Sequence, residues 1–328
     1  MVSRKDVAKL ANVAPSTVSN SINGTKYVSE ECRLKVMKAI KELNYEPNLI
    51  ARSLKKNHTK SIVVFINDLY NSYYAEICDG ILEIAYQNEY TVTICLANDP
   101  QKEYYKEFYS RRTDGMINLS KMFATEESYE RLKNMALVNV RKFDNEFYVS
   151  VNYVKAVEDF VKNLVESGKK NLGVITGTAK EDIMNDTRYI ALKHYTKLAN
   201  INFDEKNLLF RNDVINRNQS DVGYEEMEKL LKLSPDIDAV FCINDLLAYG
   251  AACKLRQEGL KIPEDVSICG CDNVFFSKFC EPAISSMTFD KVDFGKKCMH
   301  ILLGQINKND SADKHCIIMA EYVKRDSV

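Results

Sequence analysis

Four small polar side chains near the N-terminus stand within five residues of one another, as one side of a short helix would present them. They are Ser16, Thr17, Ser19 and Asn20. Pro15, just before them, suits the first position of a helix because its missing N–H would be unpaired there in any case. Hydroxyl and amide groups on a helix of this kind can hydrogen-bond to base edges in a DNA major groove. The chemistry these residues offer is therefore sequence readout.

The elements that must position these side chains are two short amphipathic helices joined by a tight turn. Ser3 can cap the first helix with Asp6 as its capping-box partner, and Val7, Leu10 and Ala11 fall on one face. Only Asn12 and Val13 are left for the turn, and the second helix buries Val18 and Ile22. The pattern predicts a helix-turn-helix head. Ala14 precedes the proline and cannot act as a side-chain cap, which costs the second helix roughly 1 kcal/mol.

The head resembles that of the lactose-repressor family of bacterial transcription regulators. The resemblance rests on residues 6–19, on Tyr27–Arg33 at the start of a third helix, on Ile40–Asn48 and on Ala51–Leu54. It implies contacts with DNA from Lys5, Ser16, Thr17, Ser19, Asn20, Asn23, Asn48, Ala51, Arg52, Leu54 and Lys55. The family often has Arg where this chain has Asn20. Because Asn reads adenine well and guanine poorly, the operator need not follow the commonest pattern.

Residues 47–60 have the composition of a short helix followed by a basic linker. Such a helix is marginal in free solution and needs DNA or a partner to hold it. The resemblance implies a hinge helix that pairs with its twin in a dimer and inserts Leu54 into the minor groove, where an apolar wedge kinks the duplex. The alternative is a plain linker.

Charge is divided unevenly along the 328 residues. Residues 1–60 contain 12 Lys and Arg against 5 Asp and Glu, whereas the remainder contains 33 against 41. A basic head on an acidic body suits nucleic-acid binding. No apolar run of about 18 residues predicts a membrane span. The N-terminus is charged and helical rather than an apolar signal segment, so we expect a cytoplasmic protein.

The ten cysteines do not follow a metal-binding spacing. No C-x-x-C pair occurs, and the one C-x-C is Cys269-Gly270-Cys271, while Cys95 and Cys242 lie within apolar strand patterns. This pattern favours reduced, buried thiols of a cytosolic protein over zinc binding or redox sensing. The sequence predicts neither a cofactor nor a metal.

From residue 61 onward, β-rich apolar runs alternate with helical segments. The runs lie at 61–66, 91–97, 115–119, 136–140, 172–176, 239–243 and 267–271, and helices are expected at 73–89, 154–167, 186–199, 220–233 and 245–259. This alternation predicts an α/β core of two doubly wound parallel sheets with helices on both faces, behind an all-α head.

The body also resembles the ligand-binding core of the same family, shared with periplasmic sugar-binding proteins. Residues 68–77, 243–251 and 262–273 carry this resemblance. It implies two subdomains with a cleft between them, and three chain crossings near residues 155, 290 and 318. The expected division is a head at 1–46, a hinge at 47–60 and a core at 61–328. The core's N-subdomain takes about 61–155 and 291–318, and its C-subdomain about 156–290 and 319–328.

Ligands of open α/β sheets bind beyond the carboxyl ends of the strands. Asp245 follows the strand predicted at 239–243. The resemblance implies that its carboxylate holds sugar hydroxyls, of which it can accept two at once, and the alternative is that it caps the next helix. The resemblance places an effector among Asp68, Asn71, Tyr73, Tyr74, Arg141, Arg188, Asp245, Asp272 and Phe289. The alternatives are a solvated Arg188, aromatic rings that belong to the core, and an Asp272 that is mostly structural.

Two departures from the family bear on the effector. Arg141-Lys142 replaces an Asp-Arg pair common in sugar-responsive members, and Phe289 replaces a common Gln. Both changes remove partners for sugar hydroxyls. Two cations beside Arg188 favour an anionic effector, such as a phosphorylated or acidic sugar, because charge-assisted hydrogen bonds are the stronger ones. The alternative is that both cations point to solvent.

These features predict a DNA-binding regulator, most simply a repressor, that binds a pseudo-palindromic operator as a homodimer under the control of a small carbohydrate-like effector. A partner protein could replace the small molecule. A solute-binding protein would fit the body but not the head. No G-x-G-x-x-G, P-loop or G-x-S-x-G motif occurs, and the four histidines follow no catalytic order, which argues against an enzyme.

Overall fold

The structure is a computed structural model. It describes residues 2–24, 26–45, 58–97, 99, 102–120, 132, 134–140, 146–211 and 218–328. The chain divides into two compact units, Met1–Thr59 and Lys60–Val328. The predicted hinge contacts of Asn48, Ala51, Arg52, Leu54 and Lys55, and the cations Arg141 and Lys142, lie outside the described residues.

The head is formed by helices α1 (Arg4–Leu10), α2 (Pro15–Asn23) and α3 (Glu30–Glu42), as the sequence predicts. The helices pack around Val7, Ala8, Ala11, Val18, Val36 and Ala39. The Asp6 carboxylate accepts from the N–H and the hydroxyl of Ser3, at 2.8 and 2.7 Å. Leu10, which the helical spacing places on the same face as Val7 and Ala11, is 46% exposed. Val7, Ala8 and Ala11 fill that face instead.

Helix α2 begins and ends as its sequence dictates. Pro15 takes the first position after Ala14, which makes no side-chain cap. Gly24 ends the helix in the left-handed region at φ 62°, where glycine carries no Cβ penalty. Val18 is fully buried and Ile22 packs against the head core, as expected.

The first sheet of the core has six parallel strands in the order β11-β5-β4-β3-β1-β2. They are β1 (Ser61–Ile66), β2 (Thr91–Leu96), β3 (Gly115–Asn118), β4 (Ala136–Asn139), β5 (Tyr148–Asn152) and β11 (His315–Met319). In β1, Ile62 and Val64 face one buried cluster, and Val63 and Phe65 face another. Both faces of the sheet are therefore covered, which explains why β1 reads as an unbroken apolar run.

The second sheet has four parallel strands in the order β7-β6-β8-β9. They are β6 (Leu172–Ile175), β7 (Leu208–Leu209), β8 (Ala239–Cys242) and β9 (Ser267–Cys269). A separate antiparallel pair joins β10 (Ser286–Thr288) to β12 (Glu321–Val323). The chain thus passes from the first sheet to the second after β5, returns after β10, and leaves again after β11.

Helices cover these sheets. Those that lie where the periodicity predicts a helix are α5 (Ser72–Gln87), α8 (Val154–Glu166), α10 (Thr187–Leu198), α11 (Gln219–Leu233) and α12 (Asp245–Gln257). The sequence pattern did not predict α6 (Tyr105–Ser110), α9 (Lys180–Met184) and α13 (Lys291–Ile306). None of the helices in the described ranges is long and apolar enough to cross a membrane.

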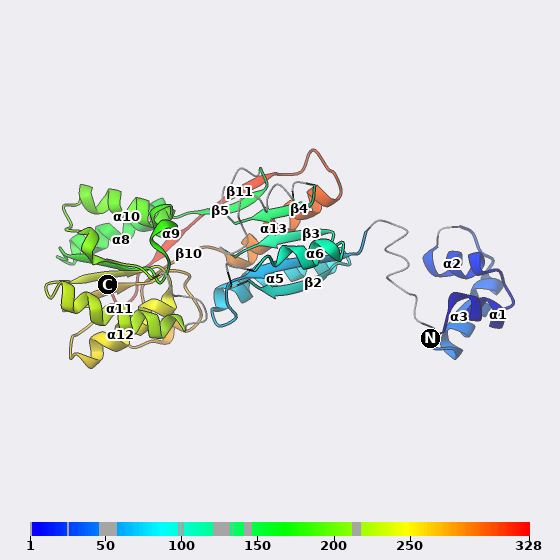
Figure 1. Cartoon of the computed structure of the whole chain (residues 1–328), viewed down its shortest axis with the longest axis horizontal. Helices are drawn as coiled ribbons and strands as arrows, with labels where there is room; N and C mark the ends of the chain where they lie inside the picture. Colours follow the sequence, from blue (N-terminus) through cyan, green and yellow to red (C-terminus); the bar gives the residue numbers. More distant parts are fainter. Residues whose placement is uncertain are drawn as a thin grey trace. The chain divides into compact units, whose positions relative to one another are not determined.

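Helix α13 packs against α5 although more than 200 residues separate them, and Figure 1 shows this orange segment returning to the first sheet before the C-terminus. The two backbones touch at glycines. A Cβ on Gly80 would lie 2.0 Å from the Val292 carbonyl oxygen, and one on Gly295 equally close to that of Ile77. Only glycine allows this approach, which sets the N-terminus of α13 beside α5.

Candidate functional site

The head presents one face of α2 to solvent. Ser16 and Asn23 are exposed, whereas Thr17, Ser19 and Asn20 are half-buried at its edge. The opposite side of the helix is anchored by Val18 and Ile22 in the head core. The helix therefore holds small donors and acceptors outward on a rigid support, which is what direct readout of base edges requires.

Ser19 has intramolecular partners that the sequence did not reveal. Its hydroxyl accepts a 2.8 Å hydrogen bond from Nη1 of Arg4 and donates to the Pro15 carbonyl at 3.2 Å. Asn23 donates from Nδ2 to the Ser19 carbonyl at 2.9 Å. Arg4 thus ties the start of α1 to α2. Lys5 beside it is exposed and able to meet a phosphate.

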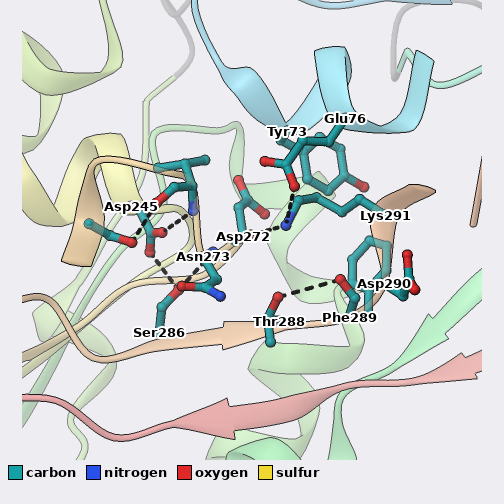
Figure 2. Close-up of polar contacts among 12 residues, drawn as sticks. Tyr73, Glu76, Asp245, Asp272, Asn273, Ser286, Thr288, Phe289, Asp290 and Lys291 are labelled. Carbon is teal, nitrogen blue, oxygen red and sulfur yellow. Dashed lines mark hydrogen bonds and ion pairs between the residues drawn. The ribbon is translucent and has the colours of Figure 1, made fainter. Parts of the chain in front are cut away.

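In the core, four of the candidate effector residues, Tyr73, Asp245, Asp272 and Phe289, lie in one region, which Figure 2 shows. Asn71, the N-cap of α5, belongs to the side of the first sheet, and Asp245 and Asp272 follow β8 and β9 of the second. The Asn71 amide donates to the Asp272 carboxylate at 3.1 Å. This hydrogen bond joins the two sides.

Arg188 lies in this region with only 15% of its side chain exposed. Its Nε and Nη2 donate to both oxygens of Asp186 at 2.9 and 2.7 Å, and Nη1 donates to the Ile243 carbonyl at 3.0 Å. The guanidinium also lies over the Tyr153 ring, 5.1 Å from its centroid. Burial opposes the charge, but Asp186, Cys271 and Tyr153 together outweigh it and hold the pKa of Arg188 well above its ordinary value.

Asp245 is fully buried. One carboxylate oxygen accepts from the Val274 N–H at 2.9 Å, and the other from the Ser286 hydroxyl at 2.7 Å. The helix cap is Asn244, which accepts from the Leu247 N–H, so the capping alternative for Asp245 does not hold. Burial raises the pKa of Asp245 to about 8. The geometry makes Asp245 an anchor for the Val274 and Ser286 segments, and a ligand would have to displace one of these partners to reach it.

Asp272 is the acid that Asn71 contacts from the side of the first sheet. Its backbone is in the left-handed region at φ 97°, and its carbonyl accepts from the Lys291 ammonium at 2.8 Å. Lys291 in turn pairs with Glu76 of α5 at 3.1 Å, as Figure 2 shows. Burial raises the pKa of Asp272 to about 6, against the opposing effect of Arg188. Asp272 is therefore contacted by Asn71, the N-cap of α5, and by Lys291 of α13.

Aromatic rings wall the same region. Phe289 is buried and meets Tyr73 and Tyr153 edge-on, with centroids 6.0 and 6.4 Å apart. Tyr73 also meets Tyr74 edge-on at 5.2 Å. Burial raises the pKa of Tyr73 well above its ordinary value, so its hydroxyl stays protonated. The replacement of a common Gln by Phe289 therefore enlarges an apolar wall.

Asp68 and Tyr74 face other partners. The Asp68 carboxylate accepts from the N–H groups of Tyr70 and Asn71, both at 2.8 Å, which shapes the loop before α5. The Tyr74 hydroxyl accepts from Asn67 at 3.1 Å. Asp68 therefore has a loop-shaping role here, and its contact with an effector stays a prediction, as do the contacts of the other core residues.

Sequence reasoning missed Tyr153, Asp186, Ser286 and Lys291. Asp186 stands two residues before Arg188 and caps α10, a local pattern that could have been noticed. The other three come from segments whose approach depends on the chain crossings, and nothing in their neighbouring residues marks them.

Comparisons with known proteins agree with this architecture. Residues 4–48 match the model for bacterial regulatory proteins of the lacI family, and residues 161–328 match that for the periplasmic binding protein-like domain. The HTH-type transcriptional repressor PurR of Histophilus somni is 31% identical to this chain, over 100% of the chain and 99% of the relative.

Solved structures share the fold. The lac repressor dimer bound to operator and the anti-inducer ONPF superimposes with a TM-score of 0.85, at 21% identity, over 99% of this chain and 98% of that one. A complex of the transcriptional regulator CelR with cellobiose gives 0.72, at 22% identity, over all of both chains. The chain therefore belongs to the lacI family of bacterial regulatory proteins, as a DNA-binding transcriptional repressor with an effector-binding core and not an enzyme.

Proposed function

We propose that this repressor binds a pseudo-palindromic operator as a homodimer. The observation that carries the proposal is the head, in which α2 presents a single small polar face able to read one half-site. Two heads in register are needed for useful affinity, and a two-fold dimer reads two inverted half-sites. Because its target is the bacterial chromosome, we place the protein in the cytoplasm.

Sedimentation and gel-shift measurements on the full chain test this proposal. We expect a dimer whose affinity for a selected operator falls steeply with salt, because Lys and Arg contacts release counterions from phosphates. Exposed Lys5, Lys9 and Arg33 are the described residues expected to contribute. A monomer whose affinity for DNA does not change with salt concentration would contradict the proposal.

Asn20 is expected to choose a base. Replacing Asn20→Arg should shift one half-site position from adenine toward guanine by about 1–3 kcal/mol, since Arg pairs with two guanine acceptors. Selection from a random DNA pool measures the change, with Lys38→Ala on the exposed side of α3 as a control that should keep the wild-type consensus. An unchanged consensus for Asn20→Arg would remove Asn20 from the readout set.

For the hinge, we infer the family's arrangement with Leu54 as the minor-groove wedge, together with the subdomain boundaries stated above. The resemblance of residues 47–54 supports this, and the three crossings between the sheets agree with boundaries near 155, 290 and 318. Leu54→Gly should weaken specific binding more than non-specific binding, because the kink belongs to the specific complex.

The effector is proposed to be a carbohydrate or a derivative of one. The aromatic wall of Tyr73, Tyr153 and Phe289 suits the apolar face of a sugar ring, and Asn71 and Asp272 offer hydrogen-bonding groups beside it. The solved complex of CelR with cellobiose supports a sugar in this fold. Binding would have to exchange some of the polar contacts that now join the two sides.

The charge of the described residues favours a neutral sugar. Arg188 is paired in a bidentate manner with Asp186, and Lys291 is paired with Glu76. An anionic sugar is the second candidate, and it rests on Arg141 and Lys142, which the described ranges do not include. A partner protein in place of the sugar is the remaining alternative for regulation.

Regulation would follow from a shift between two arrangements of the core. An effector held between the sheets favours the arrangement in which Asn71 and Asp272 stay close, and it does so only by binding that arrangement better. Helix α13 and the α5 N-terminus carry the change, because they contact the junction and the first sheet together.

A calorimetric screen of neutral and phosphorylated sugars tests the effector proposal. We expect Tyr73→Ala to weaken binding by about tenfold, from the loss of aromatic contact. Tyr86→Ala, on the same helix but exposed, should leave the affinity unchanged. Neutral-sugar binding that survives Arg141→Asp with Lys142→Ala would exclude the anionic candidate. Sugar binding unaffected by Tyr73→Ala would place the effector elsewhere.

A further inference from the structure

Five of the ten free cysteines are partly exposed, in contrast to the expectation of buried thiols: Cys32, Cys95, Cys253, Cys280 and Cys316. Two of them, Cys253 and Cys280, come from different elements of the second half of the core. Cys253 is on α12, and Cys280 follows the 3-10 turn Ser277–Phe279. Neither belongs to the effector site.

Arg256 joins the surroundings of the two thiols. Its Nη2 lies 3.3 Å from the Cys253 sulfur, and its Nη1 donates to the carbonyl of Glu281, the residue after Cys280, at 2.8 Å. One planar guanidinium therefore spans the gap between α12 and the segment that carries Cys280. It also places a positive charge where negative charge develops on the Cys253 sulfur during reaction.

Tyr249 of α12 and Phe276, which precedes the 3-10 turn, form a second contact between α12 and the segment that carries Cys280. Their rings meet edge-on at 5.9 Å, and the Cys280 thiol donates to the Phe276 carbonyl at 3.5 Å. The Cys253 thiol, one helical turn from Tyr249, raises the pKa of that phenol. Both sulfurs thus flank one aromatic pair.

Cys271 shows why proximity to an arginine is not sufficient. Its sulfur lies 3.5 Å from Nη1 of Arg188, but the residue is fully buried, and burial raises its pKa to about 12. An oxidant cannot reach it and the thiolate does not form. Cys253 differs because solvent reaches it beside its guanidinium.

We propose that Cys253 and Cys280 form a thiol pair that hydroperoxides oxidise to an intrachain disulfide. The Cys253 thiolate attacks the terminal oxygen of the hydroperoxide, so that an S–O bond forms and the O–O bond breaks. The hydroxide or alkoxide that leaves takes up a proton and becomes water or an alcohol. The sulfur is oxidised to a sulfenic acid while the peroxide is reduced. The Cys280 sulfur then attacks this sulfenic acid, an S–S bond replaces the S–O bond, and water leaves with the Cys280 proton.

The disulfide would fix the segment from Val274 to Cys280 against α12. The Val274 N–H holds Asp245, and Asp272 stands two residues earlier in the chain. Oxidation is therefore expected to change the effector response, an expectation that rests on the proposed function. The chemistry at the two thiols does not depend on it.

Peptide mapping by mass spectrometry after hydrogen peroxide treatment of the full chain tests the pair. We expect a disulfide that joins Cys253 to Cys280 within one chain, formed before oxidation at Cys95 or Cys316, the internal controls. In Cys280→Ser, Cys253 should instead be trapped as a sulfenic acid by dimedone. Arg256→Gln should slow the oxidation about five- to tenfold. Arg111→Gln, a matched change at the exposed arginine that caps the C-terminus of α6, should not.

Three results would overturn the proposal: equal oxidation rates at Cys253 and the control cysteines, a Cys253 disulfide between two chains, or an Arg256→Gln variant that reacts at the wild-type rate. None of these readouts needs an effector. A disulfide that forms as described but leaves sugar affinity unchanged would refute only the regulatory consequence, so failure of the thiol pair and failure of the effector proposal are distinguishable.

Discussion

Replacing Arg188→Met should lower the free energy of unfolding of the core by about 3–5 kcal/mol, because Asp186 is left as an uncompensated buried charge. Both side chains are largely buried, with 15% and 9% exposed. The substitution also removes the Nη1 donor to the Ile243 carbonyl. Urea unfolding of the full chain, followed by circular dichroism, measures the loss.

Two further variants separate the buried charge from the lost packing. The double variant Arg188→Met with Asp186→Asn should recover most of the stability, since Asn keeps the α10 cap without the charge. Arg111→Met, which breaks an exposed pair with Glu107, should cost no more than about 1 kcal/mol. A double variant no more stable than Arg188→Met would show that the ion pair is not the cause.

Replacing Asp245→Asn should stabilise the core increasingly as pH rises from about 4 to about 8. The folded pKa of Asp245, about 8, lies above the ordinary value of 3.8 because the carboxyl is buried. The folded state therefore holds a proton that the unfolded state has released, and wild-type stability falls through this window. The fall is at most about 1.4 kcal/mol per pH unit.

The asparagine side chain can keep both contacts, accepting from the Val274 N–H and donating to the Ser286 oxygen. The quantity to measure is the difference in unfolding free energy between the variant and the wild type at several pH values. This difference cancels the titrating groups that do not interact with Asp245. It does not cancel Asp272, whose charge also raises the pKa of Asp245. A difference that does not change between pH 5 and pH 8 would show that Asp245 titrates as an ordinary carboxyl.

The head and many of the regular elements of the core could be predicted because their causes are local. Pro15 and Gly24 mark the two ends of α2, and Ser3 with Asp6 marks the start of α1. The unbroken apolar run of β1 indicates that both faces of this strand are buried. The exposure of Leu10 could not be predicted, because the packing of α3 decides which apolar residues of α1 are covered. The short strands β10, β11 and β12 escaped because their pairing partners are remote in the chain.

What the sequence by itself determined is the polar face of α2, the alternation of strands and helices, and the candidate acids that follow β8 and β9. Only the tertiary structure decided what those side chains meet. The chain crossings bring Lys291 to the Asp272 carbonyl and Phe289 to the Tyr73 ring. Asp186 forms an ion pair with Arg188. The Val274 N–H and the Ser286 hydroxyl both donate to Asp245. The physical reason is that burial and ion pairing depend on neighbours in space, and here those neighbours lie up to about 200 residues apart.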